Sequence, residues 1–249
     1  MLVNTTSFQN WIVKRVTVKL SNNLHAKVSI RHVEFGLFNK MLLEGTLVLD
    51  KKNDTLLYAE TAKVNITDWF FLKDNITLKY VALDDAIINL NRKDSTWNYQ
   101  FLVDYFSNPK KKTDTSKNVL KLDLKTVELN RVKVFKKDEW GGQNAVISFD
   151  KLYFTPDVFD TKNKIIKINE INLDHPLYAE YNFPGGRPQI IKDLIDASKT
   201  NGLRWNVEDW FITVNNIKIK DGGLAIESAA AKAPYNNMFD GGQIGRAHV

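Results

Sequence analysis

The sequence predicts a mainly β protein with a helix at its N-terminal end, and three observations support this prediction. Apolar and polar residues alternate through most of the chain, which is the period of a half-buried strand. One pattern of four apolar residues recurs along the chain. Apolar residues at helical spacing form a long run only near the N-terminus, in residues 6–22.

The composition fits a folded protein. The 249 residues are 43% hydrophobic and 26% charged, which is enough to bury a substantial core. The absence of cysteine excludes a disulfide scaffold, a zinc ribbon and a cysteine nucleophile. The net charge of +6 favours an anionic partner such as lipid headgroups or nucleic acid, although a lysine-rich soluble surface would give the same charge.

The helix over residues 6–22 is expected to be amphipathic. Thr6 or Ser7 can cap its first turn, and the polar run that starts at Ser21 ends it. Its apolar residues recur near the helical period: Phe8, Trp11, Ile12, Val16 and Leu20.

Strands, turns and one or two shorter helices are predicted after this helix. Strands outside the recurring pattern are expected over residues 45–50, 57–66 and 146–154. Short helices are expected over residues 99–106 and 189–198. Residues 51–54 predict a hairpin turn, and residues 107–118 predict a long polar loop.

The recurring pattern is apolar-x-apolar-x-x-apolar-x-apolar, and its copies begin about 48, 46, 44 and 46 residues apart. The five copies are Val28, Ile30, Val33 and Phe35; Ile76, Leu78, Val81 and Leu83; Leu122, Leu124, Val127 and Leu129; Ile166, Ile168, Ile171 and Leu173; and Ile212, Val214, Ile217 and Ile219. A regular strand keeps alternate residues on one face, so the step of three in the middle would turn the second pair over. We therefore expect a bulge or corner there, which keeps both pairs on one face.

The apolar face of such a sheet must be covered by something. A second sheet would cover it in a sandwich, and stacked repeats would cover it in a solenoid. A lipid-transfer groove would instead leave it concave and open to acyl chains. The periodicity does not separate these three possibilities.

The sequence contains no catalytic constellation. His25, His32 and His175 lack metal-ligand spacing with a nearby carboxylate. Asp84 and Asp85 are adjacent and would point apart in a strand, so a turn is favoured over a carboxylate pair. We therefore expect no enzymatic activity, no cofactor and no metal site.

Several stretches of the chain carry a family resemblance: residues 8–16, 20–24, 27–35, 42–50 and 54–59 and the pair Trp97–Asn98. Together they resemble TamB-like proteins of the AsmA superfamily, in the form found in Bacteroidota. The resemblance is specific over residues 8–100 and looser to about residue 228.

This resemblance implies an elongated, curled antiparallel sheet of taco-like section, with an apolar groove lined by the recurring residues. It implies a periplasmic protein, anchored in the inner membrane, that carries phospholipid between the inner and outer membranes and supports outer-membrane biogenesis. The partners implied are phospholipid, the membrane and an outer-membrane protein of the Omp85 class, with no nucleic acid. The alternative is a structural β-solenoid or stalk with a filled core and no lipid conduit.

The same resemblance divides the chain. Residues 1–24 are expected to be the helix that follows a membrane anchor, and residues 25–228 the repeat β domain with its groove. Residues 229–249 are expected to be an irregular, truncated tail. Within it, residues 244–249 match the translation of a sequencing adapter, and we exclude them from the fold.

Overall fold

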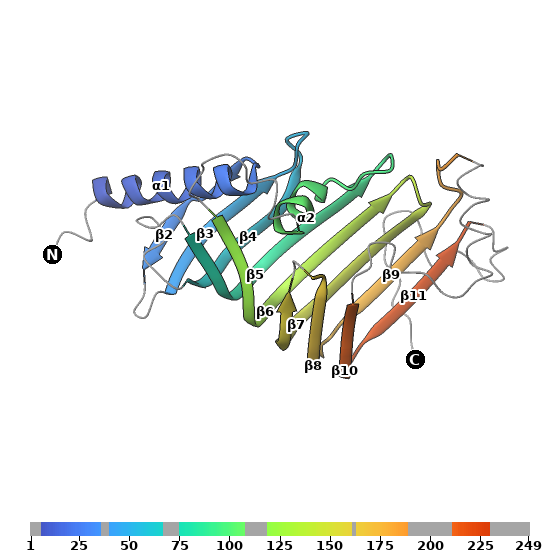
Figure 1. Cartoon of the computed structure of the whole chain (residues 1–249). Helices are drawn as coiled ribbons and strands as arrows, with labels where there is room; N and C mark the ends of the chain where they lie inside the picture. Colours follow the sequence, from blue (N-terminus) through green and yellow to red (C-terminus); the bar gives the residue numbers. More distant parts are fainter. Residues whose placement is uncertain are drawn as a thin grey trace.

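The computed structural model describes residues 6–35, 40–66, 75–107, 119–160, 163–188 and 211–229. In these residues one open, curled sheet of eleven strands carries two helices toward one end (Figure 1). The prediction of a mainly β protein is confirmed. The elements in chain order are α1 (Thr6–Leu24), β1 (Val28–Ser29), β2 (His32–Phe35), β3 (Lys40–Leu49), β4 (Thr55–Ile66), β5 (Asn75–Arg92), α2 (Gln100–Ser107), β6 (Val119–Asp138), β7 (Gln143–Asp160), β8 (Ile165–Asp174), β9 (Leu177–Asn182), β10 (Phe211–Lys220) and β11 (Gly223–Ser228).

Helix α1 covers the end of the sheet formed by β1 and β2. Its Ile12 and Val16 are only 3% and 0% exposed and belong to the same core cluster as residues 28–33. Trp11 and Val18 occupy other positions on the helix and are about half exposed. The hydroxyl of Ser21 accepts the N–H of Val28 at 3.1 Å, which ties the end of the helix to the first strand.

The two short helices have different outcomes. Helix α2 confirms the one expected over residues 99–106, and its aromatic residues Phe101, Tyr105 and Phe106 pack on the same core cluster as α1. The helix expected over residues 189–198 lies outside the described residues, as do residues 108–118 of the polar loop and 230–249 of the tail.

The sheet is mixed, so the prediction of an antiparallel sheet is wrong in part. Hydrogen-bonded neighbours follow the order β1-β3-β4-β5-β6-β7-β8-β10, with β2 beside β3, β9 beside β7 and β11 beside β9. The pairs β5–β6, β8–β10 and β9–β11 are parallel. The connections explain this result, since the short turn at residues 51–54 joins antiparallel strands, whereas the long segment containing α2 allows β6 to return parallel to β5.

The first copy of the apolar pattern is reversed relative to the others. Through β3 and β4, Val28 is aligned with Ile88 and Phe35 with Val81, so β1 and β2 run opposite to β5. Copies two to five lie on β5, β6, β8 and β10, which all run in one direction. Copies two to five therefore share one strand direction, and the first copy is antiparallel to them.

The interruption expected within the pattern is present as a change of register in copies two to four. In β5, Lys79 is the extra residue between Leu78 and Tyr80, and β6 passes residues 123–125 at the same place. In β8 the register with β7 shifts between Ile171 and Ile168. Figure 1 shows β5 and β6 turning sharply near their lower ends. We call this line of interruptions the bend.

A second interruption crosses the sheet at residues with positive φ, which lie in β3, β5 and β6 and at the junctions β8–β9 and β10–β11. This left-handed row consists of Gly45, Asp85, Arg131, His175 and Asp221. On either side of Asp85, the side chains of Leu83, Ala86 and Ile88 belong to one core cluster, so the left-handed residue keeps both flanks on one face. Asp84 and Asp85 therefore lie within a strand rather than in the turn that the sequence favoured.

Gly45 is the one glycine of this row, and a side chain at this position would have little room. Its φ is +57°, and a Cβ there would lie 2.9 Å from the Cβ of Arg31. We expect Gly45→Ala to lower the free energy of unfolding by about 1–3 kcal/mol, because alanine is strained in the left-handed region and Arg31 must move. Urea denaturation measures this loss. Gly186→Ala is the control, since its Cβ would meet its nearest neighbour at 3.6 Å, and an equal loss there would contradict the explanation.

Candidate functional site: the apolar face of the sheet

Apolar side chains form two continuous rows across the sheet, and residues directly opposite in a ladder share a face. The first row is Met41, Val64, Val81, Val127, Phe154, Ile171 and Ile217. The second row is Leu43, Ala62, Leu83, Leu129, Leu152, Leu173 and Ile219. These rows define the apolar face, and they bring together the second apolar pair of copies two to five.

A third apolar row continues this face beyond the left-handed row. It consists of Val48, Leu57, Ile88, Val134, Ile147, Tyr178 and Leu224. Leu83 and Ile88 pack on the same cluster, so the second and third rows face the same way. The face is therefore continuous from β3 to β10 and β11.

In copies two to five the first pair begins on the other side of the bend, whereas Val28 of the first copy is aligned with Ile88 in the third row. Ile166 and Ile168 of β8 are aligned with Ile212 and Val214 of β10, as the repeat predicts. The strands β5 and β6 are aligned differently from the repeat, because Ile76 is opposite Leu120 and Leu78 is opposite Leu122. Leu124 falls in the interruption at residues 123–125. The bend in β6 therefore contains three residues, whereas the sequence pattern predicts two between its apolar pairs.

The exposure of the predicted residues rises along the sheet. Val28, Ile30 and Val33 are 5%, 6% and 1% exposed beneath α1, so they form protein core. The middle of the face is a second cluster built from strand side chains, centred on Ala59, Ala86, Val132 and Phe149. At β10, Ile217 and Ile219 are 53% and 62% exposed. Among the described residues, the helices cover one end of the face and the other end is open.

A buried ion pair that the sequence search missed lies where the apolar face ends. Arg92 and Asp138 are opposite one another in β5 and β6, and the Arg92 Nε donates to Asp138 Oδ1 at 2.8 Å. The Gly141 N–H donates to the same oxygen at 2.7 Å, and the guanidinium lies 4.5 Å from the ring centroid of Trp97. These two residues are 46 positions apart, which is the spacing of the repeat and the one signal that could have paired them.

These contacts favour the charged form of the Asp138 carboxyl. Burial alone would raise the pKa of the Asp138 carboxyl, but the Arg92 guanidinium and the Gly141 N–H outweigh it and lower that pKa. The hydroxyl of Tyr178, which belongs to the third apolar row, has a pKa shifted in the opposite direction. Burial, together with the hydrogen bond from its hydroxyl to Glu180, raises the pKa of Tyr178 to about 12.

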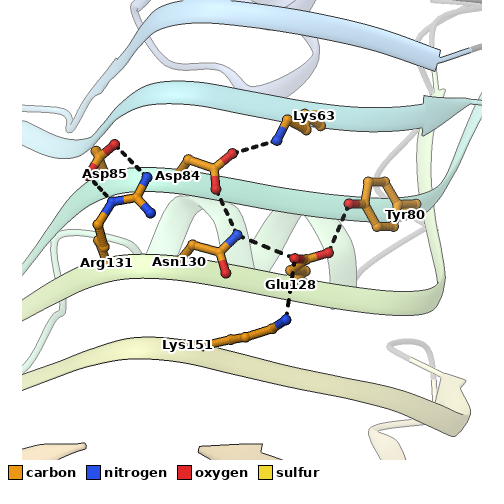
Figure 2. A network of polar contacts seen from close by, with 8 residues as sticks. All are labelled: Lys63, Tyr80, Asp84, Asp85, Glu128, Asn130, Arg131 and Lys151. Carbon is orange, nitrogen blue, oxygen red and sulfur yellow. Dashed lines mark hydrogen bonds and ion pairs between the residues drawn. The ribbon is translucent and has the colours of Figure 1, made fainter. Parts of the chain in front are cut away.

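The opposite face of the sheet carries a polar network (Figure 2). Asp84 accepts hydrogen bonds from Lys63 at 2.8 Å and Asn130 at 2.7 Å. Glu128 accepts one from the Tyr80 hydroxyl at 3.3 Å and lies 4.0 Å from the ammonium of Lys151. The network therefore links β4, β5, β6 and β7.

Two features of this network set its electrostatics. Burial would raise the pKa of Asp84, but its hydrogen bonds from Lys63 and Asn130 lower it overall. The paired hydrogen bonds from Arg131 lower the pKa of Asp85, and both of these side chains are more than half exposed. The two faces of the sheet thus differ sharply in polarity, one being charged and the other aliphatic.

His175 lies close to acidic side chains. Its ring nitrogens have carboxylates of Asp174, Asp150 and Asp221 at 2.9, 3.4 and 3.7 Å, which the sequence spacing did not predict. Within the described ranges, no group of three or more such side chains is placed to hold a metal ion.

The helices of the described residues are also too short or too polar to cross a bilayer. Comparison of the chain with protein-family models finds no match. Comparison with curated proteins also finds none.

Proposed function

We propose that the apolar face binds the acyl chains of phospholipids and that the protein carries lipid along it. The observation that carries this proposal is the continuity of the two rows from Met41 and Leu43 to Ile217 and Ile219, with large aliphatic side chains exposed at the far end. Soluble proteins rarely expose a contiguous apolar surface that serves no binding purpose. The curled sheet, in this proposal, is a groove of taco-like section.

The mechanism needs no reacting residue. Each methylene moved from water onto the face contributes about 0.8 kcal/mol, whatever its position along the rows. Because neighbouring sites on the face are chemically alike, an acyl chain can shift from one to the next while its headgroup stays in water. The face therefore supports passive movement.

The resemblance to TamB-like proteins of the AsmA superfamily gives this proposal its setting. The protein would lie in the periplasm, anchored in the inner membrane by a segment that precedes α1. It would serve outer-membrane biogenesis, with an Omp85-class protein as its outer-membrane partner. The polar network on the opposite face would then contact water rather than lipid.

A structural stalk with a filled core is the second candidate function. The cluster beneath α1 and α2 favours it, because Ile12, Val16 and Val33 fill that end of the face with protein. The two functions differ at the other end of the sheet, where a stalk has no need to bind a lipid.

Photo-crosslinking from Ile219 tests the proposal. With benzoylphenylalanine at this position and phosphatidylcholine vesicles, we expect a lipid adduct that mass spectrometry detects. The same probe in place of Phe135, which is 40% exposed on the opposite face, is the control. Equal labelling from both positions, or none from Ile219 in a folded chain, would leave only the stalk.

A charge placed on the open end of the face should abolish this capture. We expect Ile217→Asp to lower the yield of adduct from Ile219 at least tenfold, because a carboxylate buried against acyl chains costs several kcal/mol. The side chain is 53% exposed, so the circular dichroism spectrum should be unchanged. Ile87→Asp is the matched control, since Ile87 is 41% exposed and lies on the opposite face. A similar loss in both variants would contradict a face-specific site.

A further inference from the structure

Two charged side chains lie on the apolar face, directly beyond its third row. Residues opposite one another in a ladder share a face, and a regular strand returns to that face at every second residue. Lys136 of β6 lies two positions beyond Val134 of the third row. Glu180 of β9 lies two positions beyond Tyr178 of the same row. We call this next row the charged row, and it consists of Leu90, Lys136, Ala145, Glu180 and Ile226.

Neutral groups hold both charges of this row. The Lys136 ammonium donates a hydrogen bond to the side-chain oxygen of Gln143. Glu180 accepts hydrogen bonds from the Tyr178 hydroxyl and from Asn182, the latter at 2.6 Å. In the part of the chain that the structure describes, neither Lys136 nor Glu180 forms an ion pair. Each charge therefore lies beside an apolar surface without an opposite charge in contact.

Partial burial makes the charge of Lys136 unfavourable on its own. The side chain is half-buried, and its ammonium lies 5.8 Å from the ring centroid of Trp97. Burial lowers the pKa of Lys136, and the nearby carboxylates of Asp138 and Glu180 offset only part of this effect. An anion in contact with the ammonium would stabilise the charged form, because opposite charges attract more strongly where water is largely excluded.

Glu180 is held in its charged form. Burial alone would raise the pKa of the Glu180 carboxyl, but the hydrogen bonds from Tyr178 and Asn182 outweigh it and lower that pKa. A carboxylate held in this way remains able to accept a hydrogen bond from a cation.

The two charges are separated by one strand. β7 lies between β6 and β9, so the backbones of Lys136 and Glu180 are two strand spacings apart, which is about 10 Å. The residue between them is Ala145, which is 5% exposed and places only a methyl group on this face. A ligand with an anion and a cation a few atoms apart would therefore contact both side chains at once.

We propose that Lys136 and Glu180 bind the headgroup of a phospholipid that carries a phosphate and a primary ammonium, an inference that rests on the proposed function. The Lys136 ammonium donates to the phosphate, and the ammonium of the lipid donates to the Glu180 carboxylate. The third apolar row lies beside the charged row, so the acyl chains of the same lipid lie on aliphatic side chains. Phosphatidylethanolamine has this chemistry.

Such a site distinguishes lipids by the group that faces Glu180. Phosphatidylcholine has a trimethylated nitrogen, which donates no hydrogen bond to the carboxylate. A site built to hydrogen-bond one group of a ligand rejects an analogue that lacks it. Phosphatidylglycerol has no cation at all and leaves Glu180 facing an anion.

Competitive photo-crosslinking tests the inference. With benzoylphenylalanine in place of Ile219 and vesicles of phosphatidylethanolamine and phosphatidylcholine in equal amounts, the wild-type chain should yield about tenfold more adduct with phosphatidylethanolamine. Glu180→Gln should bring the two yields close to parity, because the amide has no charge. Glu227→Gln changes the same group on the opposite face and should keep the preference. An equal loss in both variants would overturn the inference.

Lys136→Gln tests the other half of the site. It should lower the adduct yield for both lipids about tenfold, since both carry the phosphate that Lys136 contacts. Lys133→Gln is the matched control, because Lys133 is exposed on the opposite face of the same strand. Circular dichroism shows whether each variant is folded. A folded Lys136→Gln chain with an unchanged yield would contradict the proposed contact.

Soluble competitors test the site in the wild-type chain, without any variant. Glycerophosphoethanolamine should suppress the phosphatidylethanolamine adduct at lower concentration than glycerophosphoglycerol or inorganic phosphate, since only the first carries both charges. Equal suppression by all three would assign the charged row to free phosphate and overturn its role in lipid binding.

The crosslink from Ile219 in pure phosphatidylcholine separates this inference from the proposed function. We expect Glu180→Gln to leave that adduct unchanged. A wild-type chain that forms the adduct but shows no preference for phosphatidylethanolamine would refute the headgroup site alone. A wild-type chain that forms no adduct with either lipid would refute the proposed function, and the inference with it.

Discussion

Val132→Asp is expected to leave the chain unfolded, or to lower its free energy of unfolding by about 4 kcal/mol or more. Val132 is 0% exposed and lies in β6 between Ala86 and Phe149, at the centre of the cluster made from strand side chains. A carboxylate there would be buried with no cation beside it in the cluster. Because domains of this kind are stable by only about 5–15 kcal/mol, this one change removes a large part of the total.

The matched control is on the same strand. Phe135→Asp introduces the same group three residues away, at a side chain that is 40% exposed on the opposite face. This control should lower the free energy of unfolding by about 1 kcal/mol or less, since the new carboxylate stays in water. Urea denaturation followed by tryptophan fluorescence compares the two. Similar midpoints would show that the middle of the face is not a packed core.

Asp138→Asn is expected to lower the free energy of unfolding by about 3 kcal/mol at neutral pH, because it leaves the Arg92 guanidinium without its carboxylate. Asp138 is 3% exposed, and Arg92 is also largely buried. Asparagine has nearly the same shape, so the loss measures the charge rather than the packing. Denaturation in urea at pH 7 gives the value.

The pH dependence of the same variant provides a second measurement. The pKa of Asp138 is lower in the folded state than in the unfolded state. The contribution of this carboxylate to the free energy of unfolding is therefore complete above the unfolded pKa, near 3.9, and is lost as the pH falls through the folded pKa. The difference between wild type and Asp138→Asn should therefore shrink at pH 3. Asp157→Asn, at an exposed carboxylate, should show little effect at either pH. A difference that stays constant from pH 7 to pH 3 would contradict the role assigned to the ion pair.

Local periodicity allowed much of the fold to be predicted. The helix at residues 6–22, the turn at residues 51–54 and the strands around them depend on neighbours in sequence, and the structure has all of them. The second apolar pairs, such as Val127 and Leu129, lie in the rows that the repeat predicts, because a strand buried on one face fixes its own register. The interruption in the middle of the pattern follows from the same alternation.

What the sequence did not reveal depends on partners far along the chain. The reversal of the first copy is invisible in its residues, since Val28 and Val33 fit the pattern equally well in either direction. The parallel return of β6 depends on its long connection, and the cover over Val33 depends on where α1 docks. Arg92 and Asp138 each resemble an ordinary surface charge until the ladder between β5 and β6 places them opposite one another.

The left-handed row also restricts how this chain can change in length. Asp85 of β5 and Arg131 of β6 lie at one level with His175, between β8 and β9, and Asp221, between β10 and β11, and each shifts the alternation of side chains by one residue at the same step. Deleting one residue between Leu83 and Ala86 would invert every side chain that follows it in β5, while its neighbours kept their orientation. Insertions and deletions should therefore accumulate in the connections, where added length alters no pairing, and the strand segments between the two interruptions should keep a constant number of residues among homologues.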